Sequence, residues 1–173
     1  DDERITAMLP VHEYREDEFI FMATSNGTVK KTPLMDFSRQ RSTGLIAIEL
    51  EEGNTLVGAA VTDGTKDVML FGSGGKVIRF KESDVRAMGR TARGVRGIKL
   101  KADQSVISLI IPDPDGILLI ASRNGYGKRA QVEDFSVIGR GGQGVIGMKL
   151  SERNGDMVGA SQVFPGDEVL LIS

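Results

Sequence analysis

The chain has 173 residues, of which 40% are hydrophobic and 27% are charged, and it contains no cysteine and no tryptophan. The lack of cysteine excludes a disulfide framework, which suits a cytoplasmic protein. No apolar run reaches the roughly 18 residues that a membrane-spanning helix needs, and no signal peptide opens the sequence, so no membrane association is expected.

The first part of the chain predicts a series of short strands. An apolar run at Ile5–Val11 precedes a predicted hairpin, Phe19–Thr24 with Thr28–Thr32, whose turn Ser25-Asn26-Gly27 supplies glycine for the positive φ of a primed turn. Pro33 ends the second strand because it has no N–H to donate. A basic loop (Leu34–Thr43), a closing run GLIAIEL (Gly44–Leu50) and a third apolar run (Leu56–Thr62) follow in that order.

The same order recurs twice further along the chain. The hairpin turns are Ser73-Gly74-Gly75 and Arg123-Asn124-Gly125, and the closing runs are GVRGIKL at Gly94–Leu100 and GVIGMKL at Gly144–Leu150, each 50 residues after the last. Apolar runs at Val106–Pro112 and Met157–Val163 complete the pattern. The sequence is therefore that of a repeat protein.

Four predicted strands in about 50 residues is the period of a propeller blade. We expect an all-β fold, a β-propeller of four-stranded blades that forms an incomplete ring. The chain is predicted to be one repeat domain over 1–173, with units at about 5–55, 56–105 and 106–156 and a partial unit at 157–173. Because the first residue is Asp and the last run stops where a hairpin turn should follow, we expect a fragment of a longer protein.

Catalytic and metal-binding patterns are not evident in the sequence. His12 is the only histidine and stands beside Glu13 in a linker, where we expect a solvated surface residue. The carboxylates do not form the clusters of a metal site, and the glycine-rich steps lack the Gly-Lys-Ser/Thr of a phosphate-binding loop. No catalytic residue, metal or cofactor is therefore predicted for this domain.

The basic residues recur in register. The fourth residue after each hairpin glycine is basic, and residues 76–101 carry nine basic and two acidic side chains. Stacked blades would place equivalent positions on one rim, and a curved belt of cations suits a bent phosphate backbone. The predicted DNA-binding residues are Lys30, Lys31, Arg39, Arg41, Lys76, Arg79, Lys81, Arg86, Arg90, Arg93, Arg96, Lys128, Arg129 and Arg140.

Another interpretation of these cations remains. Lysine and arginine in loops and at strand ends are usually part of a soluble surface. In that case the domain would be a protein-interaction propeller that binds a partner on one end face, and the rim charges would serve solubility alone.

The runs FMATSNGTVKKT, VMLFGSGGKVIRFKESDVRAMGRTARGVRGIKL and NGYGKR resemble the C-terminal domain of DNA gyrase A, over essentially the whole chain. That family forms a six-bladed β-pinwheel, in which neighbouring blades share strands. The resemblance implies binding and wrapping of duplex DNA without base specificity, in a bacterial type IIA topoisomerase that introduces negative supercoils. The expected partners are duplex DNA, the gyrase A catalytic core and gyrase B, and ATP and Mg²⁺ would be used elsewhere in that enzyme. The equivalent domain of topoisomerase IV is the alternative within this resemblance.

The family's basic box, Gln-Arg-Arg-Gly-Gly-Lys-Gly, is absent in that form. In the third unit Arg140, Gly141, Gly142 and Gly144 match it, while Ile138, Gly139 and Gln143 depart from it. In the second unit Arg90 and Gly94 match and Arg93 replaces the lysine, and in the first only Arg39 and Gly44 match. The resemblance therefore implies a fragment that starts after the first blade and stops before the last is complete.

Overall fold

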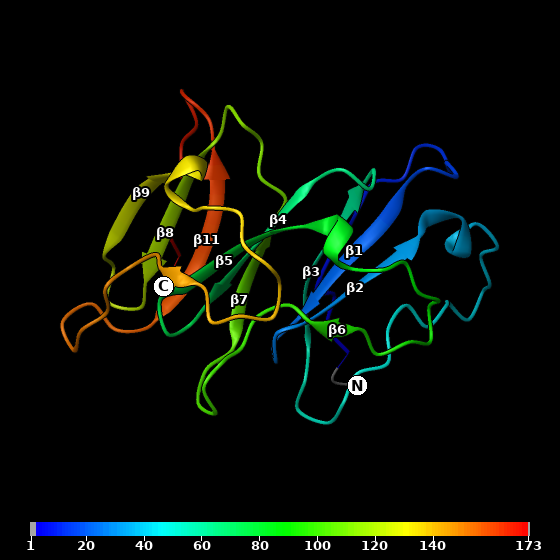
Figure 1. The fold of residues 1–173 in the computed structure, drawn as a ribbon, viewed down its shortest axis with the longest axis horizontal. Helices are drawn as coiled ribbons and strands as arrows, with labels where there is room; N and C mark the ends of the chain where they lie inside the picture. The colour runs from blue at the N-terminus through cyan, green and yellow to red at the C-terminus, as the bar shows by residue number, and fades with distance from the viewer. Residues whose placement is uncertain (1–2, 173) are drawn as a thin grey trace.

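The computed structural model describes residues 3–172, which form eleven β-strands, three short 3-10 turns and no α-helix. The strands make three antiparallel sheets, in the orders β3-β1-β2-β6, β10-β5-β4-β7 and β11-β8-β9 (Figure 1). The predicted all-β class and the strand-rich repeat are confirmed. The strands are β1 (Phe19–Thr24), β2 (Thr28–Pro33), β3 (Leu56–Thr62), β4 (Asp67–Gly72), β5 (Lys76–Lys81), β6 (Val95–Arg96), β7 (Val106–Ile110), β8 (Ile117–Ser122), β9 (Gly127–Gln131), β10 (Val145–Ile146) and β11 (Met157–Val163).

The three predicted hairpins are present. Each pairs two strands around a turn whose last glycine has positive φ: 89° at Gly27, 87° at Gly75 and 83° at Gly125. Gly75 is also required for space, because a Cβ there would meet the Met148 carbonyl oxygen. A 3-10 turn follows each hairpin, η1 (Leu34–Phe37), η2 (Glu82–Asp84) and η3 (Val132–Asp134).

The fourth strand of a sheet comes from the next repeat. β6 pairs with β2 through Thr28↔Arg96, and β10 pairs with β5 through Lys76↔Ile146. Blades therefore share strands, as the resemblance implied. Within residues 3–172, β9 has no equivalent partner.

The sheets group the strands differently from the predicted units, by one strand. The sequence places Leu56–Thr62 in the second unit with β4 and β5, but β3 pairs with β1 in the first sheet, in the register Met22↔Ala59. In the same way β7 joins β4 and β11 joins β8. The 50-residue period fixes the spacing of the repeats but does not say which hairpin an apolar run joins, since Leu56–Thr62 and Val106–Pro112 each stand between two hairpins in the sequence.

The hydrophobic core lies between the blades. Val68 and Leu70 of β4 pack toward the first sheet in one cluster, while Met69 and Phe71 of the same strand pack toward the third sheet in another. The alternation of a strand places successive side chains on opposite faces, so both faces of the middle sheet are buried. Each blade is thus stabilised by its neighbours, as repeat proteins require.

The two end segments form no strand within the described residues. Ile5–Val11 has the sequence character of the other apolar runs, but Ile5 is 91% and Met8 88% exposed. The predicted partial unit is likewise irregular after β11, with Leu170 83% exposed, and Ser173 lies outside the described residues.

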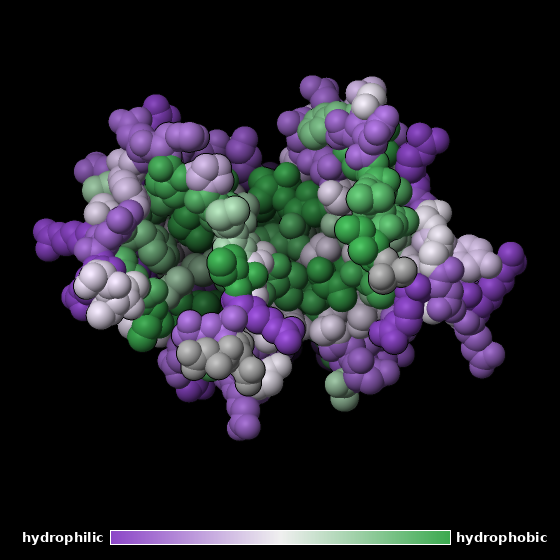
Figure 2. Space-filling model, turned by 180° about the vertical axis from the view of Figure 1, so that it is seen from behind, coloured by the Kyte–Doolittle hydropathy of each residue, from purple (hydrophilic) through white to green (hydrophobic). Residues whose placement is uncertain are grey.

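Hydrophobic areas are broad on the face turned away in Figure 1, with hydrophilic residues along its borders (Figure 2). Among the described residues, no helix is long and apolar enough to cross a membrane.

Candidate nucleic-acid interface

Two of the three cations in the hairpin register hold neighbouring repeats together. Lys31 extends from β2 and donates from Nζ to the Glu82 carbonyl oxygen at 3.1 Å. Arg79 extends from β5 and donates to the Val132 carbonyl oxygen, also at 3.1 Å. Glu82 and Val132 are the first residues of η2 and η3, so each cation binds the 3-10 turn of the following repeat.

Burial and pairing remove these side chains from solvent. Lys31 is 6% exposed and its ammonium lies over the Phe19 ring, 4.9 Å from the centroid. The Arg79 guanidinium also pairs with Asp67, with 2.7 Å between Nη2 and Oδ2, and only 19% of the Arg79 side chain is exposed. Lys31 and Arg79 are predicted DNA-binding residues, but in this structure their donors are used inside the protein.

Lys30 is buried as well, with no exposed surface. Its Nζ donates to the carbonyl oxygens of Ala47 and Arg90. Burial, with Arg90 as the next contribution, lowers the pKa of Lys30 to about 8. Lys128 makes the equivalent bond to the Gly147 carbonyl oxygen at 3.1 Å but lies in an exposed strand. The ammonium group of Lys30, another predicted DNA-binding residue, is thus also held inside the protein.

The loop arginines fasten each loop to the preceding closing run. Arg90 donates to the Ile46 carbonyl oxygen and Arg140 to the Arg96 carbonyl oxygen, both at 3.1 Å and both across 44 positions. Arg140 donates in addition to the Asp84 carbonyl oxygen at 2.9 Å. Both arginines therefore have a structural role, although Arg140 remains exposed.

The other predicted cations fall into separate exposed groups. Arg39 and Arg41 lie on the first basic loop, and Lys81 and Arg86 lie near the end of β5 that is remote from its hairpin turn. Arg129 is exposed and makes no side-chain hydrogen bond or ion pair with residues 3–172. The hairpin register thus does not form a continuous solvent-facing belt.

A cluster of cations outside the hairpin register lies near the hairpin turns of the first two blades, where the closing run of the second repeat crosses the first turn. Lys76, Lys99 and Lys101 line one hollow of about 150 Å³, and Arg96, Lys99 and Lys101 line an adjoining hollow of about 360 Å³. We call these four residues the Lys99 cluster. Lys99 and Lys101 are among the nine basic residues of 76–101 but have no predicted role, because they follow the arginine-rich loop and its register. The signal that identifies Lys99 and Lys101 is their position at the end of a closing run, because that run crosses the adjacent hairpin turn.

A third hollow, of about 390 Å³, continues from the Lys99 cluster toward the first blade. It is lined in part by Arg93, Arg96, Glu49 and Glu51. Arg93 donates to the Glu49 carboxylate at 2.8 Å and lies 3.6 Å from a carboxylate oxygen of Glu51. The hydrogen bond from Arg93 to Glu49, with the charges of both glutamates, raises the pKa of Arg93. Arg93 is therefore neutralised locally by acidic side chains.

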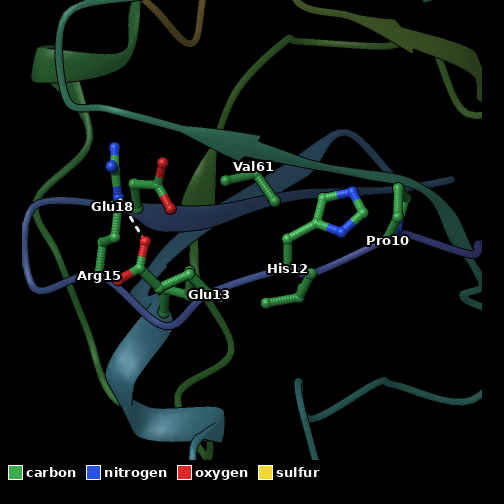
Figure 3. A pocket seen from close by; sticks show the side chains of 8 residues that line it. Pro10, His12, Glu13, Arg15, Glu18 and Val61 are labelled. Carbon is green, nitrogen blue, oxygen red and sulfur yellow. Dashed lines mark hydrogen bonds and ion pairs between the residues drawn. The ribbon is translucent and has the colours of Figure 1, made fainter.

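The hollow around His12 does not have the features of a catalytic site. It has a volume of about 270 Å³ and lies between the N-terminal segment and the first blade (Figure 3). His12 is exposed, and the ion pair in the hollow joins exposed Arg15 and Glu13, with 3.3 Å between Nε and Oε2. No group of three His, Cys, Asp or Glu side chains that could hold a metal occurs among the described residues.

Comparison with known proteins gives a consistent match. The family model described as "DNA gyrase C-terminal domain, beta-propeller" matches residues 18–63, 66–113 and 116–163. DNA gyrase A of Pseudomonas aeruginosa is 60% identical over 90% of this chain, and that of Klebsiella oxytoca is 55% identical over 99%. The chain spans about a fifth of these relatives, 17% and 20% of their lengths.

Two solved structures share the fold. A DNA gyrase A C-terminal domain matches with a TM-score of 0.82 and 27% identity, over 94% of this chain and 55% of that one. The C-terminal domain of a DNA topoisomerase IV matches with the same TM-score and identity, over 90% and 49%. The likeness in fold does not distinguish the two enzymes, whereas the curated relatives named above are gyrase proteins.

Proposed function

Because the chain belongs to the DNA gyrase C-terminal domain family, a part of gyrase A in a type IIA topoisomerase, we propose that it binds and bends duplex DNA without base specificity. The observation that carries this proposal is the concentration of cations in the second repeat, where residues 76–101 hold nine basic and two acidic side chains and six of the nine basic ones are exposed. Arginine and lysine displace condensed counterions from phosphates, which provides affinity without reading the bases.

Bending sets the number of contacts that the domain has to make. Smooth bending of a 20–30 base-pair site by 40–90° costs on the order of 1–6 kcal/mol, so several phosphates have to be neutralised along the surface. The proposed contacts are the exposed cations of residues 76–101 other than Arg93, together with Arg39, Arg41 and Arg129 of the neighbouring repeats. Lys30, Lys31 and Arg79 instead maintain the relative placement of the blades that carry these contacts.

Within the parent enzyme the domain would act as a non-catalytic accessory. Strand cleavage and the use of ATP and Mg²⁺ are assigned to other parts of gyrase, and the gyrase A catalytic core and gyrase B are the proposed protein partners. A domain that bends DNA next to the catalytic core would present a crossed segment for strand passage and so favour negative supercoiling.

A salt titration tests the DNA-binding proposal. The protein is mixed with a nonspecific duplex of about 40 base pairs at several salt concentrations, and the logarithm of the association constant is plotted against the logarithm of the salt concentration. Each phosphate contact should contribute about 0.9 to the slope. A protein-interaction propeller predicts no binding even at low salt, and that outcome would reject the proposal.

A topology assay tests bending separately from binding. A nicked DNA circle is relaxed with the protein bound and ligated, and the trapped writhe is read after the protein is removed. Wrapping predicts a shift of the topoisomer distribution that grows with protein concentration, whereas unbent binding predicts none. The same assay on the gyrase A and topoisomerase IV relatives provides the comparison between the two enzymes.

A further inference from the structure

The closing runs of the first two repeats end in opposite charges. Counted from the first glycine of the closing run, the sixth residue is Glu49 in the first repeat and Lys99 in the second. The eighth residue, just after the run, is Glu51 in the first repeat and Lys101 in the second. All four side chains are exposed. Equivalent places in neighbouring repeats therefore offer carboxylates in the first repeat and ammonium groups in the second.

These charges lie along one continuous surface. The hollow that contains Glu49 and Glu51 shares Asn26 and Arg96 with the next hollow. That hollow shares Lys99 and Lys101 with the hollow that contains Lys76. The order along the surface is thus the two glutamates with Arg93, then Arg96, then the two lysines, and finally Lys76.

Arg93 marks the boundary between the two signs of charge. It extends from the loop of the second repeat but reaches back to the first, where it pairs with Glu49 at 2.8 Å and Glu51 at 3.6 Å. Glu49 occupies two of the five N–H donors of Arg93, and a phosphate approaching the remaining donors would be repelled by the two nearby carboxylates. Arg93 is therefore a weak phosphate ligand in this chain, although its loop is among the most basic.

We propose that the DNA backbone track is centred on the Lys99 cluster and ends at Glu49 and Glu51, which hold Arg93 away from phosphate. This inference rests on the proposed DNA-binding function and adds its location and boundary. The four cations of the cluster contact phosphates of one backbone segment, and the first blade contributes no contact at its closing run. The glutamates thereby set the side on which DNA leaves the protein.

The first experiment removes the centre of the track. The variant K99A/K101A loses two exposed charges, and the slope of the salt titration should fall by about 1.8. The control R15A/K66A removes the same net charge from exposed side chains remote from the hairpin turns and should leave the slope unchanged. An equal effect of both variants would show that only total charge matters and would overturn the track. If wild-type protein binds DNA but K99A/K101A keeps the wild-type slope, the track is wrong while the proposed function stands.

The second experiment removes the boundary. The variant E49Q/E51Q frees Arg93 without adding a cation, and the slope should steepen by about 0.9 if Arg93 then reaches a phosphate. The variant E49K/E51K gives the first blade the residues of the second and should steepen the slope further, with a longer stretch of DNA protected from nuclease. Unchanged slopes and an unchanged footprint in both variants would overturn the boundary. Thermal unfolding that matches wild type confirms that each variant is folded.

Discussion

Glu82 is a buried carboxyl group whose removal is predicted to stabilise the fold. It has no exposed surface and begins η2, at the position that Leu34 and Val132 fill in the other repeats. One carboxylate oxygen accepts the Lys66 N–H at 3.3 Å, while the other has no hydrogen-bond partner among the described residues. Burial raises the pKa of Glu82, and the nearby Thr62 hydroxyl and Lys31 ammonium offset only part of that effect.

The substitution Glu82→Gln keeps the shape of the side chain and the bond to the Lys66 N–H. Its new amide group can donate toward Thr62 Oγ1, which is also buried without a partner among residues 3–172. Satisfying an unpaired buried group is worth about 1–3 kcal/mol. Losing the attraction between the carboxylate and Lys31 cancels part of this, so we expect a net gain of about 1 kcal/mol near pH 8, or about 2–4 °C in the unfolding temperature.

The pH dependence follows from the raised pKa. The fold favours protonated Glu82, so its contribution is fully present below the ordinary value of 4.5 and is lost as the pH rises through the higher pKa of the folded state. The advantage of Glu82→Gln should therefore be large at about pH 8 and should shrink as the pH falls. Urea unfolding at both ends of this range measures it, with Glu133→Gln, an exposed residue of η3, as the control. A destabilised Glu82→Gln at pH 8, or an equal gain at both pH values, would refute the reasoning.

Three further predictions concern the contacts between repeats and the turns. Arg79→Met should lower the free energy of unfolding in urea by about 3 kcal/mol, because it breaks a largely buried ion pair. Arg129→Met, at the equivalent exposed position, should change the free energy of unfolding by less than about 0.5 kcal/mol in the same measurement. The folded-state pKa of Lys30 is lowered from 10.5 to about 8, so wild-type stability should gain a contribution as the pH rises between these values, and Lys30→Met should lack it in unfolding series over that range. Gly75→Ala should destabilise more than Gly125→Ala in thermal melts, since both residues have positive φ but only the Cβ at Gly75 would meet a carbonyl oxygen; equal effects would show that φ alone decides.

The sequence was sufficient for those parts of the fold that depend on local pattern. Turn glycines such as Gly27 and Gly75, between alternating apolar runs, predicted the hairpins correctly, and the 50-residue spacing predicted a blade repeat. Proximity in sequence did not predict which hairpin β3 joins, because β3 stands just before the β4–β5 hairpin but pairs with β1, on the far side of the basic loop and the closing run. The extent of the shared strands was also missed. Only Val95–Arg96 of the closing run Gly94–Leu100 forms β6, since the rest of the run turns across the hairpin of the neighbouring blade.

The candidate site was less predictable because one residue type serves two purposes. A lysine in register after a hairpin glycine has the same sequence signature whether its ammonium faces phosphate or a carbonyl oxygen. Lys30 and Lys31 are buried against main-chain oxygens, while Lys99 and Lys101, which follow no turn glycine, are exposed. Basic composition therefore identified the second blade correctly as the most cationic region but could not select the side chains available to DNA.

The environment of a repeat position, more than its register, decides what its cation does. Lys31, Arg79 and Arg129 each stand four residues after a hairpin glycine. The first two are covered because η2 and η3 of the following repeat present carbonyl oxygens to them. Arg129 is exposed because no 3-10 turn of a further repeat lies against it within residues 3–172. Basic residues at equivalent positions of stacked repeats therefore indicate contacts between the repeats. Phosphate contacts are better sought at exposed positions where the equivalent residues of two repeats differ in charge, such as Glu49 and Lys99.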